Sequence, residues 1–233
     1  MLKGLKYRIS PTDSQKELIA KHIGSSRFVY NLALETKNSA YLVSKHNFSP
    51  FDLIKQLPEL KKECEWLKEV NSQSLQQSIQ NMDITFKKFF KGAGFPKFKS
   101  KHRGRQSFSI PQNVLLENNF LVIPKFKEGI EIILHRPIEG DIKSTSISVT
   151  PTGKYFASIL VDTNEIIPQK KTINESNTIG IDLGIKDFAV TSNGEVFKNP
   201  KNLRKAQSKL KYLQRKYSKI SHSISLMRWK THS

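Results

Sequence analysis

One carboxylate stands where it could take part in metal-dependent chemistry, in the stretch TIGIDLGIKDFAVTSNGE, residues 178–195. Asp182 follows an apolar run typical of a buried strand, Gly184 permits a sharp turn, and residues 188–190 begin a second strand. An acid at the end of a central strand faces a cleft and can hold Mg²⁺, which prefers oxygen ligands. Two-metal cleavage of a phosphodiester uses several such carboxylates around ions about 4 Å apart. A single Asp after an apolar run is also a common turn or cap residue, so this motif alone leaves both interpretations open.

Positive charge is the second signal, and it is gathered into two segments that lack acidic residues. The 233 residues include 39 Lys and Arg against 20 Asp and Glu, a formal net charge of +19. Such an excess opposes compaction by self-repulsion and is usually kept for a polyanionic partner, so we expect nucleic acid to be bound. Residues 84–116 carry eight basic side chains among phenylalanines, and residues 196–233 carry eleven.

The candidate nucleic-acid-binding side chains come from both segments. Basic groups neutralise phosphates, and aromatic rings offer faces to unpaired bases. Each phenylalanine taken singly is more often a core residue, and the stretch GFPKFKSKHRGR is also compatible with a solvated loop. The basic candidates are Lys87, Lys88, Lys91, Lys97, Lys99, Lys101, Arg103 and Arg105 in the first segment, and Arg204, Lys205, Lys209, Lys211, Arg215 and Lys216 in the second.

A helix is predicted from about Asn71 to Lys91, because apolar residues recur at alternating intervals of four and three. At about 100° per residue, three glutamines fall on the face opposite this stripe. They are Gln73, Gln77 and Gln80. A glutamine amide can pair with adenine through two hydrogen bonds in the major groove, so we expect this face to read bases beside the target. Exposed glutamine is also an ordinary helix-surface residue, and that alternative stays open.

Alternation of apolar and polar residues predicts strands on both sides of this helical region. Residues 2–9 alternate as a short strand, and Thr12 with Gln15 makes a capping box that opens a helix. Alternation with period two between residues 106 and 161 predicts hairpins, with turns at Asn118-Asn119 and at Gly153, and hence a small barrel.

A second unit is expected near the end of the sequence. Residues 164–177 have the composition of a linker, and the two strands around Asp182 follow from Thr178. Residues 199–220 then predict a basic helix with one apolar stripe. An amphipathic helix at a membrane surface is a less favoured alternative, because the stripe is narrow and the whole sequence is basic.

Nearly the whole sequence resembles the TnpB family, RNA-guided DNA endonucleases that bacterial insertion sequences encode. Residues 178–195 resemble the first RuvC motif of that family. KYRISPTDSQKELIAKHIGSSRFVYNLAL resembles its opening strand and first helix. SQSLQQSIQNMDITFKKFF followed by GFPKFKSK resembles its second recognition helix and the junction into its barrel.

The resemblance implies an α+β multidomain fold, with guide RNA and DNA as partners. It makes residues 1–10 the first strand of a wedge-like β-barrel, residues 11–94 an inserted helical recognition domain, and residues 95–170 the rest of the barrel. Residues 178–233 would be a partial RNase H-like (RuvC) α/β domain with the basic helix. By the resemblance, Asp182 is the first catalytic carboxylate and a Mg²⁺ ligand, and the basic helix lies along the guide–target duplex.

The sequence departs from the family after the first RuvC motif. The family carries a later Glu and a final Asp, with a four-cysteine zinc ribbon between them, whereas this sequence has no acid after Glu195 and one cysteine, Cys64. We therefore expect no zinc site in this chain, nucleic-acid binding without the later catalytic carboxylates, and no activity of the chain alone. Asp187 begins the paired strand, and Glu195 is expected at the far end of the sheet from Asp182.

Several functions remain open at this point. The chain could be a nuclease polypeptide that is truncated, a non-catalytic regulator that binds RNA and DNA, or a conventional DNA-binding transposase subunit that uses no RNA. A separate transposase of the same element is a further expected partner. The motif IGIDLG also resembles the phosphate loop of actin-like ATPases, but those proteins carry it near the start of a much longer chain.

Composition also predicts the compartment. A single cysteine excludes an internal disulfide. The first ten residues contain no apolar signal region, and no apolar run approaches the roughly 20 residues of a membrane span. We expect a cytoplasmic bacterial protein that associates with the nucleoid and has no membrane partner.

Overall fold

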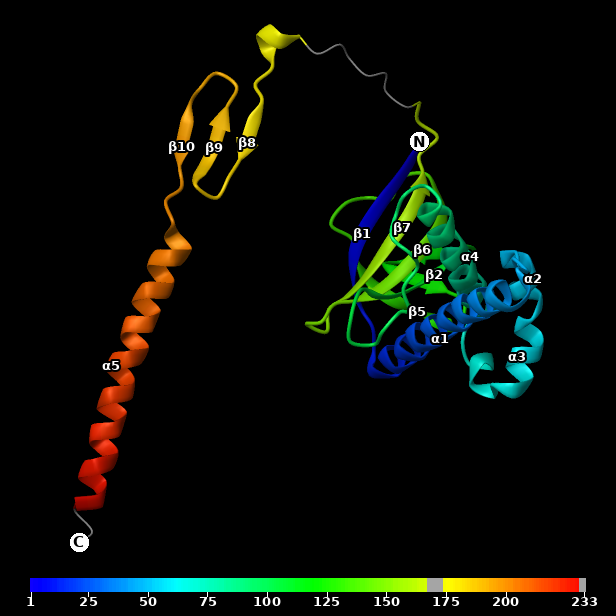
Figure 1. Cartoon of the computed structure of the whole chain (residues 1–233), viewed down its shortest axis with the longest axis horizontal. Helices are drawn as coiled ribbons and strands as arrows, with labels where there is room; N and C mark the ends of the chain where they lie inside the picture. The colour runs from blue at the N-terminus through cyan, green and yellow to red at the C-terminus, as the bar shows by residue number, and fades with distance from the viewer. Residues whose placement is uncertain (167–173, 231–233) are drawn as a thin grey trace. The chain divides into compact units, whose positions relative to one another are not determined.

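The computed structural model describes residues 1–166 and 174–230, in two units, Met1–Ile167 and Pro168–Ser233 (Figure 1). The linker predicted at residues 164–177 includes residues 167–173, which lie outside the described residues. The first unit combines one large antiparallel sheet with helices, so the α+β class expected from the sequence is observed.

The N-terminal strand β1 (Leu2–Ser10) lies in the middle of a seven-stranded sheet with the order β2-β6-β7-β1-β5-β4-β3. On one side β1 pairs along its length with β7, from Leu2 opposite Asp162 to Ile9 opposite Tyr155, and on the other side it pairs with β5. The pairing of the first strand with strands beyond residue 106, which the family resemblance implies, is therefore observed. The other strands are β2 (Gln106–Ile110), β3 (Leu115–Glu117), β4 (Phe120–Ile123), β5 (Phe126–Ile133), β6 (Asp141–Val149) and β7 (Tyr155–Asp162).

The two edge strands, β2 and β3, each pair with one neighbour among residues 1–166, so the seven strands are observed in an open order. Closure into a barrel stays a prediction. Both predicted hairpins are confirmed by their turns. Asn118 and Asn119 have φ of 45° and 65°, the left-handed conformation that a two-residue hairpin loop requires, and Gly153 has φ of 74° between β6 and β7.

The helices follow the predicted start and stop signals. Helix α1 (Asp13–Ser44) begins with the predicted capping box, in which Thr12 and Gln15 bond to each other's backbone. Helices α2 (Pro50–Lys55) and α3 (Leu57–Glu63), the short 3-10 helix η1 (Glu65–Lys68) and α4 (Ser72–Phe89) follow.

Two hydrophobic cores stabilise this unit, and α1 belongs to both of them. One core lies on the sheet and includes Tyr7, Ile130 and Ile159, together with Ile19 and Ile23 from the first half of α1. The other core joins the helices through side chains such as Leu75 and Met82, together with Leu34 from the second half of α1. The orientation of the helical region relative to the sheet is therefore set by one continuous helix.

The second unit is a three-stranded antiparallel sheet followed by a long helix. The strands are β8 (Ile181–Leu183), β9 (Asp187–Thr191) and β10 (Val196–Lys198), and they follow the short 3-10 helix η2 (Glu175–Asn177). Strand β10 was not predicted; a turn with Gly194 at φ 85° returns the chain into it. Helix α5 (Asn202–Lys230) extends ten residues beyond the predicted end at Ile220, and its side chains are described as far as Ser218.

The sequence prediction that Asp182 ends a buried strand is wrong for this unit. Ile181 and Leu183 are 63% and 72% exposed, and the sheet's buried side chain among the described residues is Ala189. The physical reason is that three short strands and a helix that does not cover them leave both faces of the sheet in water. Among the described helices of the whole chain, none is both long and apolar enough to cross a membrane.

Candidate nucleic-acid interface

The basic loop, residues 97–105, is held to α1 by its backbone. Asn31 donates from Nδ2 to the carbonyl oxygen of Lys99 at 2.9 Å and accepts from the Lys99 amide at 2.8 Å. At the end of the loop, Gln106 donates to the carbonyl oxygen of Ser100 at 3.0 Å, and Arg27 donates to Gln106 Oε1 at 2.9 Å. The loop therefore presents its basic side chains from a fixed backbone.

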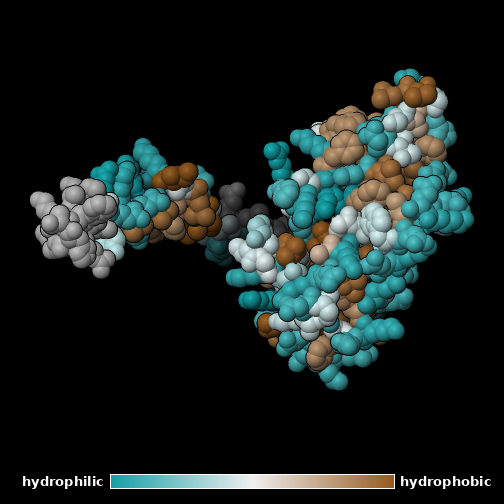
Figure 2. All heavy atoms as spheres, turned by 90° about the horizontal axis from the view of Figure 1, so that it is seen from below, coloured by the Kyte–Doolittle hydropathy of each residue, from teal (hydrophilic) through white to brown (hydrophobic). Residues whose placement is uncertain are grey.

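Two hollows flank the basic loop, and both are lined without any acidic residue. One, of about 780 Å³, is lined by basic side chains that include Arg27, Lys97, Arg103 and Arg105. The other, of about 610 Å³, lies beside the β6–β7 turn and is lined by Lys6, Lys101 and Arg105 among others. The face of the chain drawn in Figure 2 carries many hydrophilic side chains with hydrophobic patches between them. Five of the predicted basic residues, at 97, 99, 101, 103 and 105, are thus brought together around two concave surfaces.

Lys99 differs from the rest of the basic loop. Its Nζ lies 3.9 Å from the centroid of the Tyr30 ring, where burial lowers the pKa of the ammonium group. A cation committed to an aromatic face in this way is less available to a phosphate than its neighbours are. The structure therefore places Lys99 among the residues that anchor the loop.

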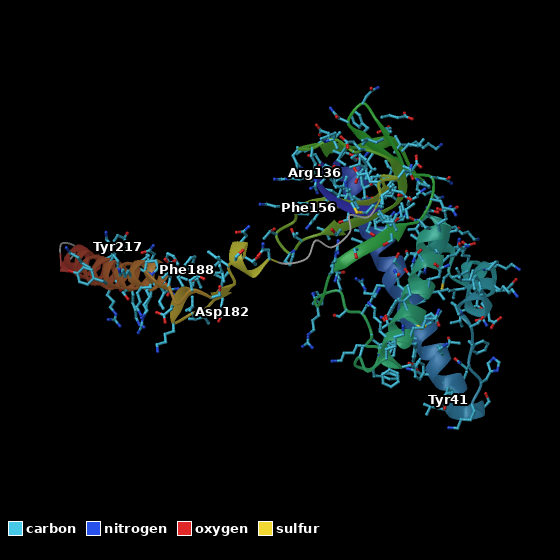
Figure 3. The ribbon with its side chains drawn as sticks, turned by 90° about the horizontal axis from the view of Figure 1, so that it is seen from above. Tyr41, Arg136, Phe156, Asp182, Phe188 and Tyr217 are labelled. Atoms are coloured by element: carbon cyan, nitrogen blue, oxygen red, sulfur yellow. The ribbon has the colours of Figure 1, made fainter. Side chains whose placement is uncertain are left out.

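Two basic residues outside the predicted basic segments belong to the same surface. Arg27, from α1, lines the larger hollow. Lys6, from β1, lines the smaller hollow, and its Nζ lies 4.3 Å from the ring centroid of Phe156, which Figure 3 labels. Neither residue lies in a basic run, so only the folding of α1 and β1 beside the loop brings them there.

The lysines at the end of α4 are divided by their contacts. Lys87 pairs with Asp83 Oδ2 at 2.9 Å, whereas Lys88 and Lys91 are exposed near the helix end. All three remain on the surface.

The predicted glutamine face is less open than the helical period suggests. Gln73, Gln77 and Gln80 are half-buried, and the Gln77 amide donates to Asn81 Oδ1 at 3.2 Å. The cause is that α4 packs against α1, α2 and β2, so that contacts extend onto the flanks of its apolar stripe. The exposed glutamine of this helix is Gln76, which is not one of the three predicted glutamines.

Base recognition by α4 is testable at these positions. We expect Gln76→Ala or Gln80→Ala to remove base preference at one position of a DNA duplex panel, because an amide pairs specifically with adenine. The discrimination lost should be about 1–3 kcal/mol, or roughly five- to 150-fold. Gln77→Ala serves as the matched control, since its amide is bound to Asn81. A base preference that survives both changes would show that this face is only solvated.

His22 holds the helices and the sheet together, and no motif or periodicity in the sequence marks it. It is fully buried; its Nε2 accepts from the Asn71 amide at 3.0 Å, and its Nδ1 lies 2.8 Å from the carbonyl oxygen of Leu18. These partners require the neutral ring with a proton on Nδ1. The ring also packs against Phe108 of β2, with 4.7 Å between ring centroids. His22 thereby joins α1, the start of α4 and the sheet that flanks the basic loop.

In the second unit, Asp182, labelled in Figure 3, is exposed. It lies opposite Val190, which lies opposite Val196. Directly opposed residues of an antiparallel sheet project from the same face. Glu195 is level with Thr191, whose amide donates to its carbonyl oxygen at 2.9 Å, and it immediately precedes β10, the strand at the opposite edge of the sheet from β8. Because side chains alternate between faces, Glu195 belongs to the other face.

The third acid of this sheet, Asp187, does not join Asp182 either. Asp187 pairs with Lys198 at 3.0 Å. Among the described residues, no group of three or more His, Cys, Asp or Glu side chains lies together. Asp182 is a suitable single oxygen ligand, but the described residues do not fit a two-metal centre, and we derive no cleavage step through one.

Helix α5 carries its predicted basic residues in water. Arg204, Lys205, Lys209, Lys211, Arg215 and Lys216 are all exposed. The apolar stripe is exposed as well, with Leu210 at 55%, Leu213 at 49% and Tyr217, labelled in Figure 3, at 75%. Asn199 fixes the start of the helix to the sheet by donating to the carbonyl oxygen of Ile185 at 2.8 Å.

A basic α+β protein with this arrangement has relatives among insertion-sequence proteins. Residues 1–45 match the IS605 OrfB family model described as "Helix-turn-helix domain", and residues 158–228 match the model described as "Probable transposase". The chain belongs to this TnpB-type family. The first description does not fit the local structure, because residues 1–45 form strand β1 and one uninterrupted helix, α1.

Individual relatives agree with the family. A "Putative RNA-guided DNA endonuclease" of Streptomyces pristinaespiralis is 31% identical over 93% of this chain and 54% of its own length. The Escherichia coli K12 protein "Putative RNA-guided DNA endonuclease InsQ" is 30% identical over 94% of this chain and 54% of its own length. The chain thus spans about half the length of these relatives. "Virulence protein VsdF" of Salmonella dublin is 36% identical over 44% of this chain and 96% of its own length.

A solved structure is similar to the chain at low sequence identity. It is a chain from the cryo-EM structure of a Cas12f1–sgRNA–target DNA complex, with a TM-score of 0.38 and 13% identity, over 93% of this chain and 61% of that chain.

Proposed function

We propose that this chain is a transposon-encoded protein that binds guide RNA and target DNA. The observation that supports this most directly is the pair of hollows around the basic loop, lined by cations from three elements and by no acid. A concave surface of one charge sign attracts a phosphate backbone and releases its counterions. The exposed cations of α5 supply a second basic surface. Two relatives named as RNA-guided endonucleases support RNA as one of the two partners.

The domain layout is part of the same proposal. Residues 1–10 and 95–170 would form the wedge-like domain, residues 11–94 the recognition domain, and residues 178–233 the beginning of a RuvC-like domain. A separate transposase of the same element would be a further partner, and the place of action would be the nucleoid in the bacterial cytoplasm.

The experiment that tests the proposal is to express the chain with its native flanking DNA, purify it and sequence the RNA that it retains. Retention of one defined transcript from the flanking DNA supports RNA guidance. Binding to DNA with no RNA retained would instead favour the alternative function, a conventional DNA-binding transposase subunit.

The catalytic role of Asp182 is tested separately. We propose that Asp182 is one Mg²⁺ ligand of the family's cleavage site, and that this polypeptide alone binds without cutting. Asp187 and Glu195 do not join Asp182, because one is paired with Lys198 and the other belongs to the opposite face. A supercoiled plasmid with Mg²⁺ and bound guide should therefore be nicked no faster by this chain than by its Asp182→Ala variant. Cutting by the unchanged chain that disappears in Asp182→Ala would contradict the proposal.

A further inference from the structure

An aromatic pocket of about 670 Å³ opens between the C-terminal ends of α1 and α4. Tyr41 of α1, labelled in Figure 3, lines it together with four phenylalanines. Gly92, with φ of 95°, ends the helical turn and lets the chain fold back. The ring of Phe95 then lies edge-on to Phe86 and Phe89, with centroids 5.7 Å and 5.2 Å apart.

Most of these rings are not explained by core packing. Phe86 is buried in the helical core, but Tyr41, Phe90 and Phe95 are 54%, 78% and 51% exposed. Aromatic rings gathered around a concavity of this size are typical of a ligand site. The lining therefore suits a flat, partly apolar ligand.

The polar side of the pocket is a buried pair of opposite charges. Lys37 and Asp83 are 9% and 8% exposed, and Lys37 Nζ lies 3.9 Å from Asp83 Oδ1. Lys37 donates to the carbonyl oxygen of Phe48 at 2.6 Å, and Asp83 Oδ2 is paired with Lys87. Among residues 1–166, no hydrogen bond is formed to Asp83 Oδ1. The pocket thus holds a free acceptor beside a donor with protons to spare.

We propose that the aromatic pocket takes an unpaired guanine, an inference that rests on the proposed nucleic-acid binding. The exposed rings would stack on the base. The Watson–Crick edge of guanine carries the acceptor O6 beside two N–H donors, which complements Lys37 beside Asp83. Uracil and thymine also place an acceptor beside one N–H donor, but they carry a second acceptor, O2, where guanine carries its amino group, so guanine alone offers the Asp83 carboxylate two donors beside an acceptor for Lys37.

The surroundings favour a nucleic-acid strand over an apolar peptide. Lys88 and Lys91 are exposed near the pocket, and the basic loop begins two residues after Phe95, so a strand bound along the loop can reach the pocket. An apolar peptide would cover Lys37 and Asp83 without giving Asp83 Oδ1 a hydrogen bond, which is unfavourable.

The test measures binding of the full chain to 12-nucleotide single strands by fluorescence anisotropy. The probes are uridine oligomers with a central guanosine, with a central adenosine or with neither, and the corresponding DNA oligomers with thymidine. The variants are Tyr41→Ala, Phe90→Ala and Asp83→Asn. The rings of Tyr41 and Phe90 are exposed, so their removal should leave the fold intact. Phe51→Ala, a 66% exposed ring on α2 outside the pocket, is the matched control. Thermal melting of each variant checks that it is folded.

Guanine-containing strands should bind the unchanged chain about tenfold more tightly than strands without guanine, as expected for one stacked and hydrogen-bonded base. Tyr41→Ala and Phe90→Ala should remove most of this advantage, and Asp83→Asn should remove the preference for guanine over adenine. A preference for guanine in either the RNA or the DNA oligomers supports the inference, and it identifies which of the two nucleic acids occupies the pocket. Equal binding of all strands by the unchanged chain, with a normal salt dependence, overturns the pocket's role but leaves the proposed function intact. Failure to bind any strand overturns the proposed function itself.

Discussion

Replacing Lys97, Lys101, Arg103 and Arg105 together by glutamine is expected to weaken binding of single-stranded RNA by about 100-fold at physiological salt. Each lost phosphate contact should lower the slope of log affinity against log salt concentration by about 0.7. The loss should be this large because the four side chains line two hollows without a compensating acid. Filter binding at salt concentrations from about 50 to about 300 mM measures the slope.

Two controls make this result specific to the basic loop. Lys99→Gln should leave the salt slope almost unchanged, because its ammonium group lies over Tyr30. Replacing Lys16, Lys55, Lys62 and Lys68, which are exposed elsewhere on the helices, lowers the net charge by the same amount. If this second set reduces the slope as much as the first, binding follows total charge and the loop is no specific interface.

The substitution His22→Leu is expected to lower the free energy of unfolding by about 2–4 kcal/mol, since it leaves the buried Asn71 amide and the Leu18 carbonyl oxygen without a partner. Urea unfolding at pH 7.5 measures the change. His46→Leu, at an exposed position, is the control and should change stability by less than about 0.5 kcal/mol.

The same residue makes stability depend on pH. Burial lowers the pKa of His22 below its ordinary value, and the nearby charge of Lys125 acts in the same direction. His22 therefore takes up a proton at a higher pH in the unfolded chain than in the folded chain. The free energy of unfolding should fall as the pH drops from about 6.5 to the lower pKa of His22 in the folded chain. Within this window the slope should approach about 1.4 kcal/mol per pH unit, and it should be absent from His22→Leu. An identical acid dependence in both proteins would show that another group is responsible.

Local signals predicted much of the fold because the interactions they describe are local. The bond between Thr12 and Gln15 spans three residues, and Asn118-Asn119 needs only its own left-handed backbone to form a hairpin. The apolar stripe of α4 likewise follows from helical geometry, and its central residues are buried as predicted.

The parts of the site that were not predicted depend on contacts between distant residues. Lys99 turns onto Tyr30, and Arg27 joins the basic loop, only because α1 passes beneath that loop. The flanking glutamines of α4 are half-buried because α2 and β2 pack there, which no periodicity within α4 contains. His22 stood alone in a helix pattern, and its partners at Asn71 and Phe108 come from two other elements.

The central place of β1 has a consequence for synthesis on the ribosome. Leu2 pairs with Asp162, so β1 leaves the exit tunnel with no partner on that side until β7 has been translated. At about 5–20 residues per second, this delay lasts about 10–30 s. During that time β1 is a nascent, unpaired strand, and such strands are prone to aggregate. Lys3, Lys6 and Arg8, which alternate with its apolar residues, give it the charge that keeps nascent strands apart until the sheet can close around it.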